Sequence, residues 1–340
     1  MKKKLLLLIV ILVLIASFFA FRFYSYIYND NVKVDVSSTI FLPTKVTFED
    51  LVDTLNSKDI LIDSRSFYWV ADKMKFRTPK PGKYIIEPGW NNHELISHLR
   101  SGSQEPVQVT FNNIRKIENL AAVFAEKLEG DSIQFVEAFT ESSLLSELGL
   151  TKENIISLFI PNTYEFYWNT SPAKVMSKMK QEHDKFWAGS RREKLNNLIF
   201  SKQEVYTLAS IVQKETNRNS EKPMIAGVYI NRLKRGIPLQ ADPTVVFAVG
   251  DFGIRRVLNK HIAVDSPFNT YKNNGLPPGP ICMPDISSID AVLDYEKHRY
   301  LYFCASPSEN GGHVFAKTLT EHNKNANIYR RWLNQRKIFK

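Results

Sequence analysis

The chain has 340 residues, of which 44% are hydrophobic and 24% are charged, and its formal net charge is +10. This composition is typical of a globular protein, and the length indicates two domains, one larger than the other. The positive charge suits a nucleic acid, an anionic membrane surface or an acidic polymer. Because the sequence has neither zinc-finger spacing nor the aromatic and basic pattern of RNA-binding modules, it argues against nucleic acid.

Residues 4–24 are expected to form a transmembrane anchor behind a basic cytoplasmic cap, residues 1–3. About 17–25 apolar residues suffice to cross a bilayer as a helix, and the "RFYSYIY" that follows supplies interfacial aromatic residues. The three lysines of the cap predict a cytoplasmic N-terminus, with the remainder outside the inner (cytoplasmic) membrane. A cleaved signal peptide is the alternative, which the long apolar run and the poor cleavage pattern disfavour.

A polar tether, residues 25–38, is expected to lead to a small α+β module, residues 39–106. The module alternates short stretches of period two, typical of strands, with stretches of helical period. Its expected elements are a strand at 38–43, a helix opened by Thr47, a second helix around Phe67–Met74, a strand at 84–87, a helix capped by Asn92 and a strand at 105–111.

The remainder, residues 107–340, is expected to be a second, larger α+β domain. Cap residues and prolines near helix starts predict several of its helices. The expected elements are helices at 117–128 and after Asp131, a loop or edge strand around Pro161, helices after Ser171 and Ser201, a helix at 220–236, a helix opened by Asp242, a short helix near 287–294, strands at 299–306 and 313–318, and a basic C-terminal helix.

A carboxylate at Glu215 stands out in the helix that follows Ser201. Ser201 and Glu204 form a capping-box pattern, and Val205, Leu208 and Val212 mark one apolar face on which Glu215 also falls. Burial raises the pKa of a carboxyl group, and a Glu that stays protonated near neutral pH can act as a general acid. The plainer alternative is a half-exposed Glu paired with Lys214, Arg218 or Arg232.

Further polar candidates follow Glu215 in the chain. Asp242 is the obvious second carboxylate, although Asp before Pro243 also fits a helix cap. The "FNTY" segment at 268–271 offers amide, hydroxyl and aromatic groups suited to a sugar, or simply to a turn. His313 follows two glycines and has no partner at a metal-ligand spacing. The candidate binding residues are Gln240, Asp242, Asn269, Thr270, Tyr271 and His313.

The sequence lacks the motifs of several other classes of enzyme. There is no G-x-S-x-G, Walker A or H-E-x-x-H motif, so no serine hydrolase, nucleotide or zinc site is indicated. Cys282 and Cys304 are the two cysteines, and two buried free thiols are a better interpretation than a disulfide framework.

Five stretches together resemble the bacterial endolytic murein transglycosylase (YceG-like) family. They are "LASIVQKET", "IAGVYINRLKRGIPLQADPTVVFA", "SPFNTYKNNGLPPGPICMP", "YLYFCAS" and "GGHVFAKTLTEHN". The resemblance is dense over residues 155–325 and looser over 40–110, where that family carries a LysM-like module. It implies a lyase that cuts peptidoglycan between N-acetylmuramic acid and N-acetylglucosamine, leaves a 1,6-anhydromuramyl end and needs no metal or organic cofactor.

The resemblance assigns the catalytic role to Glu215, the acid of "K-E-T". Two departures from the family pattern are Gln213, where a second Glu is common, and Asn162, where an Asp usually follows the proline. The first leaves Glu215 as the one acid of the motif. The second puts any role for an acid at that position in doubt.

Three alternative functions remain open from the sequence. They are a non-catalytic peptidoglycan-binding protein, a membrane-anchored scaffold that meets peptidoglycan synthases through the C-terminal helix, and a hydrolase that adds water to the cut bond. In each, peptidoglycan glycan strands and the inner membrane are the expected partners.

Overall fold

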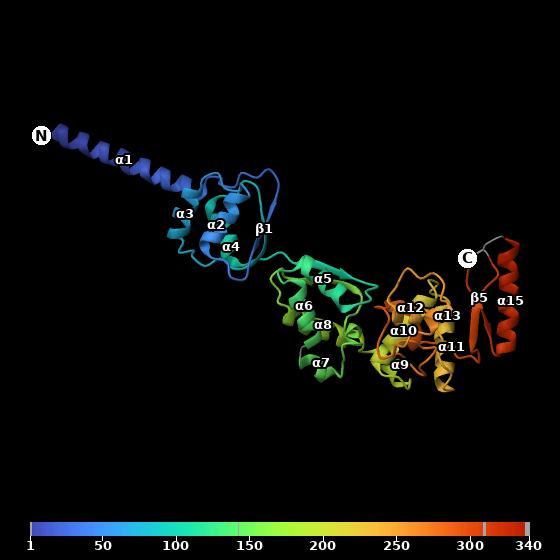
Figure 1. Ribbon diagram of the computed structural model, residues 1–340. Coiled ribbons are helices and arrows are strands. Elements are labelled where there is room, and N and C mark those ends of the chain that lie inside the picture. The colour runs from blue at the N-terminus through green and yellow to red at the C-terminus, as the bar shows by residue number, and fades with distance from the viewer. Residues whose placement is uncertain (1, 142, 309–310, 337–340) are drawn as a thin grey trace. The chain divides into compact units, whose positions relative to one another are not determined.

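The computed structural model describes residues 2–141, 143–308 and 311–336. The described chain divides into two compact units. Unit 1 holds the residues up to Val109 together with Lys127–Gly130 and Tyr164–Ser171, and unit 2 holds the remainder. Both contain helices and short two-stranded sheets, so the expected α+β class is confirmed for the described residues (Figure 1).

Unit 1 begins with the apolar helix α1 (Lys2–Tyr28). By length and composition α1 could cross a membrane, with a mean hydropathy of 2.9 over its most apolar window and none of that window buried in the protein. Its last turns pack on α3 (Ser64–Lys73), where the ring of Phe23 stacks on Trp69 at 5.0 Å between centroids. The apolar part of α1 therefore has no protein surface to cover it within the described structure.

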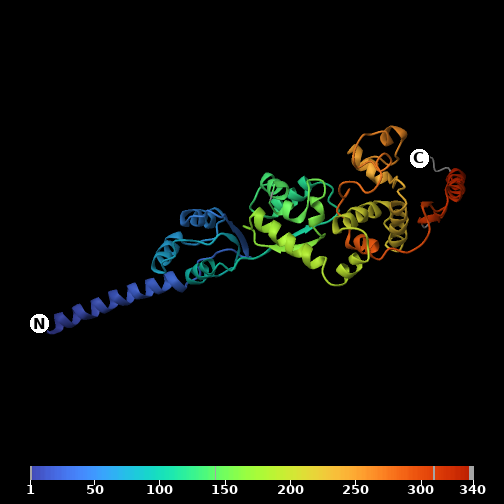
Figure 2. The same cartoon turned by 90° about the horizontal axis from the view of Figure 1, so that it is seen from below.

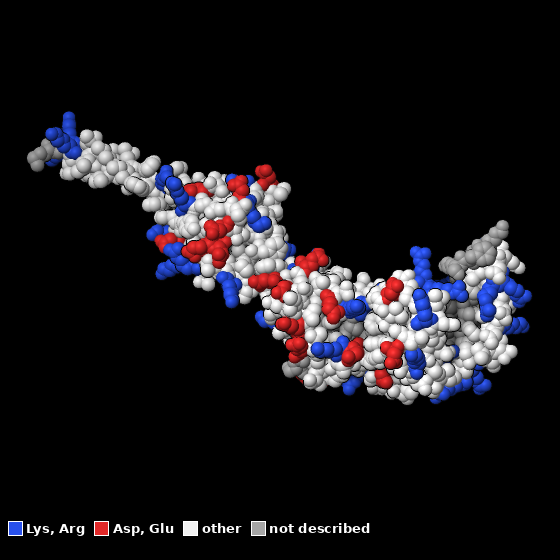
Figure 3. All heavy atoms as spheres, in the orientation of Figure 1, with Lys and Arg blue, Asp and Glu red and all other residues white. Residues whose placement is uncertain are grey.

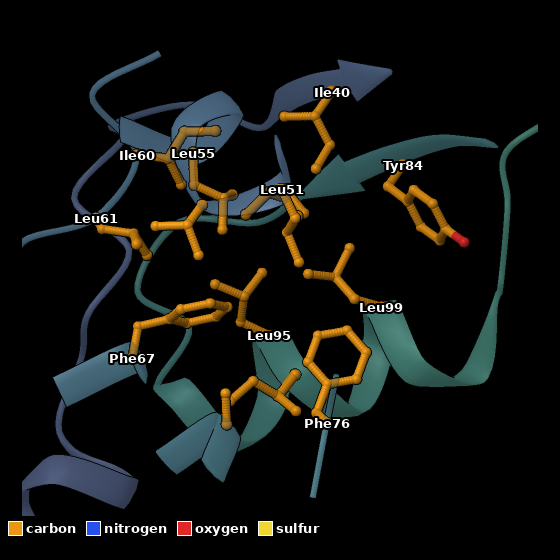
Figure 4. Packing of buried hydrophobic residues seen from close by; sticks show 14 of the residues in the cluster. Ile40, Leu51, Leu55, Ile60, Leu61, Phe67, Phe76, Tyr84, Leu95 and Leu99 are labelled. Atoms are coloured by element: carbon orange, nitrogen blue, oxygen red, sulfur yellow. The ribbon is translucent and has the colours of Figure 1, made fainter. Parts of the chain in front are cut away.

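The rest of unit 1 is built around the antiparallel pair β1 (Ser38–Leu42) and β2 (Gly82–Ile86). Ile40 lies opposite Tyr84 in the register, and both side chains point into the core. Helices α2 (Phe48–Ser57), α3 and α4 (Asn92–Ser101) contribute their apolar faces to the same core (Figure 4). Burial of these faces holds the module together, since apolar area removed from water contributes about 25 cal/mol per Å².

The N-terminal end of α4 differs from expectation by one residue. Asn91, rather than Asn92, is the cap, because its side chain accepts a hydrogen bond from the Glu94 amide. Asn92 is instead buried, where its side chain accepts from Asn31 Nδ2 at 2.7 Å and donates to the Tyr26 carbonyl at 2.8 Å. Residues around Asn31 are therefore part of the folded module, although 25–38 were expected to form a free tether.

The first part of unit 2 is mainly helical. Strands β3 (Val107–Phe111) and β4 (Asn162–Phe166), each of which belongs partly to unit 1 and partly to unit 2, form a two-stranded sheet. Four phenylalanines, Phe124, Phe135, Phe139 and Phe159, pack with ring centroids 5.0–6.5 Å apart in the neighbouring core. The helices here are α5 (Ile117–Lys127), α6 (Ser132–Glu141), α7 (Ser143–Leu148), η1 (Ile155–Leu158), α8 (Pro172–Phe186) and α9 (Ser190–Asn196).

Helix α10 (Lys202–Glu215) is the central element of the second part of unit 2. The predicted capping box at Ser201 and Glu204 is confirmed at its start. It contacts α11 (Lys222–Lys234), α12 (Asp242–Val249) and α14 (Ile286–Leu293), and α13 (Asn259–Ile262) lies against α12. This enclosure explains why the eight consecutive residues 205–212 of α10 are buried.

A hairpin and the last helix complete unit 2. Strands β5 (Tyr302–Ala305) and β6 (His313–Ala316) are antiparallel, and α15 (Leu319–Gln335) packs on them. Figures 1 and 2 both show this group at one end of the unit. Cys304 in β5 is partly exposed, and Cys282 is buried, both as free thiols. The expectation of free thiols is confirmed, although Cys304 is not fully buried.

Candidate active site

Glu215 is the last residue of α10, where the helix meets two pockets. The helix ends because Thr216 adopts an extended conformation. Val205, Leu208 and Val212, which share its face, are fully buried, and Glu215 itself is partly exposed. The predicted register is therefore confirmed, and the carboxyl group lies where the buried helix face reaches the surface of the cleft.

The Glu215 carboxyl group is held by a tyrosine of α11. Tyr229, which is buried, donates from its hydroxyl to Glu215 Oε1 at 2.5 Å. The pKa of Glu215 is raised to about 7: burial is the largest cause, the negative charge of Asp242 adds to the rise, and the Tyr229 hydrogen bond opposes it. At neutral pH a large share of Glu215 is therefore protonated, which an exposed glutamate never achieves.

The hydrogen bond from Tyr229 stabilises the ionised form of Glu215. Replacing Tyr229 with phenylalanine removes this bond and is therefore expected to raise the pKa of Glu215. A carbon-13 NMR titration of labelled glutamate would measure it, with Glu215→Gln used to assign the signal. An unchanged or lower pKa in Tyr229→Phe would contradict the role given to this hydroxyl.

Asp242 lies beside Glu215 and does not cap its own helix. Ala241 occupies the cap position of α12, and no side chain makes a cap hydrogen bond there. The capping interpretation of Asp242 is therefore wrong. Its side chain is exposed and accepts a hydrogen bond from the Tyr271 hydroxyl at 2.6 Å, a contact between residues 29 positions apart in the chain.

Two pockets meet at Glu215 and Asp242. The polar pocket, about 390 Å³, is lined by Tyr229, Arg232, Gln240, Tyr271, Tyr302 and His322 among others. The basic pocket, about 330 Å³, is lined by Arg115, Lys214, Val246, Phe247, Phe252 and Arg255 among others. Glu215 and Asp242 line both. Each is of the size that ligand pockets usually have, and we call the two adjoining pockets, with Glu215 and Asp242 at their junction, the groove.

Asn269 and Thr270, expected at the site, do not line either pocket. Asn269 is fully buried and donates to the Ile262 and Val264 carbonyls, each at 2.8 Å. Thr270 is buried and bonds the Ala241 amide and the Thr244 hydroxyl. They hold the loop that carries Tyr271 against the start of α12, so their place in the site is a supporting one.

Gln240 and His313 occupy different positions relative to the groove. Gln240 is exposed in the polar pocket. Its backbone has a positive φ of 49°, and its backbone N–H donates to the Thr270 carbonyl. His313 lies outside both pockets and pairs with Glu221, with 3.0 Å between Nδ1 and Oε2. Gln240 can therefore reach a ligand directly, whereas His313 orders the segment after α10.

Gln213, two residues before Glu215 in α10, has its side chain bonded to other protein groups. Its amide donates to Asp285 Oδ2 at 2.9 Å and its oxygen accepts from the buried Lys222 at 3.1 Å. Both ends of the side chain are thus engaged by protein groups. Glu215 is the acid of this motif that faces the groove.

The sequence did not reveal four residues of the polar pocket: Tyr229, Arg232, Tyr302 and His322. Tyr229 and Arg232 look like ordinary members of the α11 pattern, and Arg232 is buried with its guanidinium bonded to backbone carbonyls of Leu239 and Leu301, each at 2.7 Å. Tyr302 and His322 stack at 5.5 Å. They meet through the packing of α11, the hairpin and α15, for which no local pattern exists.

A carboxyl group with a raised pKa, placed where two pockets meet, is an arrangement that can supply a general acid. A model of the YceG-like family matches residues 40–328, and the chain belongs to this family. A Bacillus subtilis (strain 168) protein named endolytic murein transglycosylase is 30% identical over 301 residues, covering 84% of this chain and 82% of that protein.

Two further relatives are similar over most of the chain. A Streptococcus pneumoniae (serotype 2, strain D39) protein with the same name is 26% identical, covering 89% of this chain but 61% of its own length. A crystal structure of a YceG-like protein from Listeria monocytogenes has a TM-score of 0.56 and 27% identity, covering 86% of this chain and 99% of that one. The chain thus spans about three fifths of the streptococcal relative.

Proposed function

We propose that this protein is a membrane-anchored endolytic murein transglycosylase, a lyase that cuts the bond between N-acetylmuramic acid and N-acetylglucosamine inside peptidoglycan strands. The observation that carries the proposal is the Glu215 carboxyl group, with its pKa of about 7, at the junction of two pockets. A groove that continues on both sides of the acid suits cleavage within a strand. The family and the names of the relatives support the substrate class.

Glu215 first acts as the acid. Because Oε1 accepts the Tyr229 hydrogen bond, the proton is placed on Oε2, from which it passes to the glycosidic oxygen as the bond to the muramyl C1 breaks. The carboxylate then accepts the proton of the C6 hydroxyl as that oxygen attacks C1. One bond to C1 is exchanged for another, no water is consumed, and Glu215 is reprotonated.

Neighbouring groups stabilise the sugar during this exchange. The Asp242 carboxyl group lies near the oxocarbenium-like centre, and the hydrogen bond from Tyr271 fixes its orientation. Gln240 and Tyr271 offer amide and hydroxyl groups to the sugar from the polar pocket. In this assignment Asn269, Thr270 and His313 position these groups and do not contact the substrate.

The remainder of the chain brings the site to its substrate. Helix α1 anchors the protein in the inner (cytoplasmic) membrane, and the three lysines before it favour a cytoplasmic N-terminus with the catalytic unit outside. The 39–106 module, proposed to be LysM-like, would grip glycan, and residues 107–340 form the catalytic domain. Peptidoglycan synthases are the proposed partners, because nascent strands emerge at this membrane.

Product analysis tests this proposal. The full-length protein in detergent is incubated with purified peptidoglycan, and soluble fragments are analysed by mass spectrometry. Fragments with 1,6-anhydromuramyl ends are expected, each lighter by one water than the product of hydrolysis. Fragments with reducing muramyl ends would instead show a hydrolase, and the absence of new ends would favour a binding or scaffolding protein.

A further inference from the structure

The basic pocket differs in chemistry from the polar pocket on the other side of Glu215. Three cations, Arg115, Lys214 and Arg255, line it together with the apolar side chains of Val246, Phe247 and Phe252. Figure 3 shows Lys and Arg atoms on the face of unit 2 that carries α12 and α13. A pocket with both cations and rings suits a ligand that combines negative charge with small apolar groups.

The three cations are available to a ligand. Arg115 stacks on the Phe252 ring, with its guanidinium carbon 4.2 Å from the centroid, and this fixes its position at the wall. Lys214 donates to Asn113 Oδ1 at 2.6 Å, a neutral partner. Arg255 is exposed. Within the described residues, none of the three forms a salt bridge, so their positive charge is not neutralised by the protein.

The acidic groups of this pocket do not balance that charge. Asp242 and Glu215 are the carboxyl groups that line it, and a large share of Glu215 is protonated at neutral pH. Three positively charged side chains thus face two carboxyl groups, and the polar pocket shares both of these carboxyl groups. An anion in this pocket gains attraction that is stronger than in bulk water, because the walls are partly apolar.

The two neighbouring cavities differ from the basic pocket in the charged groups that line them. In the polar pocket, the guanidinium of Arg232 is buried and bonded to backbone carbonyls, while hydroxyl and amide groups face the space. A third cavity shares Arg115 and Phe247 with the basic pocket, and there Arg115, Lys116 and Lys152 stand with the carboxyl groups of Glu118 and Glu153, so it too holds one more cation than acid. Of the two cation-rich cavities, the basic pocket is the one that adjoins Glu215.

We propose that the basic pocket binds the anionic stem peptide of a muramyl residue next to the bond that is cut. This inference rests on the proposed function. In peptidoglycan the muramyl lactyl group carries a short peptide whose free carboxylates would meet Arg115, Lys214 and Arg255, and whose alanyl methyl groups would contact Phe247 and Phe252. The polar pocket then takes the uncharged sugars, and the protein recognises strands that still carry their peptides.

Binding by a non-cutting form of the full-length protein tests the inference. Glu215→Gln protein in detergent is titrated into fluorescently labelled glycan strands of two kinds, with stem-peptide carboxylates either free or converted to amides. The free-acid strands are expected to bind about tenfold more tightly, since each partly exposed charge contact contributes up to about a fivefold gain. Raising the salt concentration is expected to reduce the difference, because salt screens exposed charges.

Variants identify the cations responsible. Arg255→Gln and Arg115→Gln, each added to Glu215→Gln, are expected to lower the free-acid preference about threefold to fivefold, and the pair together to abolish it. Arg235→Gln removes an equal charge from an exposed position outside these pockets and should keep the preference. Arg255 is exposed, so its replacement is not expected to disturb folding, and thermal unfolding curves check this.

Two outcomes would overturn the inference: equal binding of both kinds of strand, or a preference that the double Arg variant retains. Because the titration does not depend on cutting, it is separate from the product analysis. A preference for free-acid strands together with no anhydro-ended products would refute the proposed lyase activity and leave the peptide-binding pocket in place.

Discussion

Glu215→Gln is expected to lower the yield of anhydro-ended fragments by about a thousandfold, within the range that general acid–base catalysis contributes. Glutamine has nearly the same shape and can still accept the Tyr229 hydrogen bond, but its amide neither donates an acidic proton nor accepts one. The change therefore removes the proton transfers and keeps the groove. Initial rates on purified peptidoglycan, measured by mass spectrometry of the new ends, give the ratio.

The control is Glu204→Gln at the opposite end of α10. Glu204 closes the capping box, and glutamine serves that position too, so activity and folding should both be retained. A Glu215→Gln protein that folds normally and still makes more than a tenth of the wild-type yield would rule out the assigned role. In that case the proton would have to come from another group, and Asp242 would be the first to replace.

The same substitution is expected to stabilise the fold at alkaline pH. The pKa of Glu215 is about 7 in the folded chain against an ordinary value of 4.5, so between these values the folded state holds more protons than the unfolded one. The free energy of unfolding contributed by this group therefore falls as pH rises through this window. Above pH 7 the loss reaches about 3 kcal/mol, and the Glu215→Gln variant avoids it because its amide has no charge to bury.

Denaturant unfolding at a series of pH values measures this effect. The difference in free energy of unfolding between Glu215→Gln and wild type should approach zero near pH 4.5, rise through pH 5–7 and level off above, with Glu204→Gln flat across the range. A difference that does not change with pH would show that Glu215 ionises as it would in water. Glu215 would then be ionised at neutral pH and could not act as the proposed general acid.

A loss of activity together with a gain of stability in Glu215→Gln would show that Glu215 lowers the stability of the fold while it supports catalysis. The carboxyl group is kept on a buried helix face where its ionised form is unfavourable, and the packing of the surrounding fold offsets that loss. Natural proteins commonly carry such locally unfavourable groups at active sites, where replacing them raises stability and removes function.

Much of the local structure follows from short sequence patterns. The capping box of α10 and the apolar face on which Glu215 falls were predicted from spacing alone, because both depend on residues within a few positions of each other. Two assignments failed for one reason. Asn92 and Asp242 have side chains suited to capping, but distant partners, Asn31 and Tyr271, engage them instead. A cap pattern does not show which competing partner the fold will supply.

The sequence by itself determined that one acid, Glu215, shares a helix face with buried apolar residues, that an apolar N-terminal segment precedes two folded units, and that the motifs resemble one family. The tertiary structure alone decided what that acid can do. Its raised pKa arises from exclusion of water by segments up to about a hundred residues away and from the nearby charge of Asp242, and the hydrogen bond from Tyr229 of another helix opposes this rise. Desolvation and charge interactions depend on distances in space, so no spacing along the chain could have specified them.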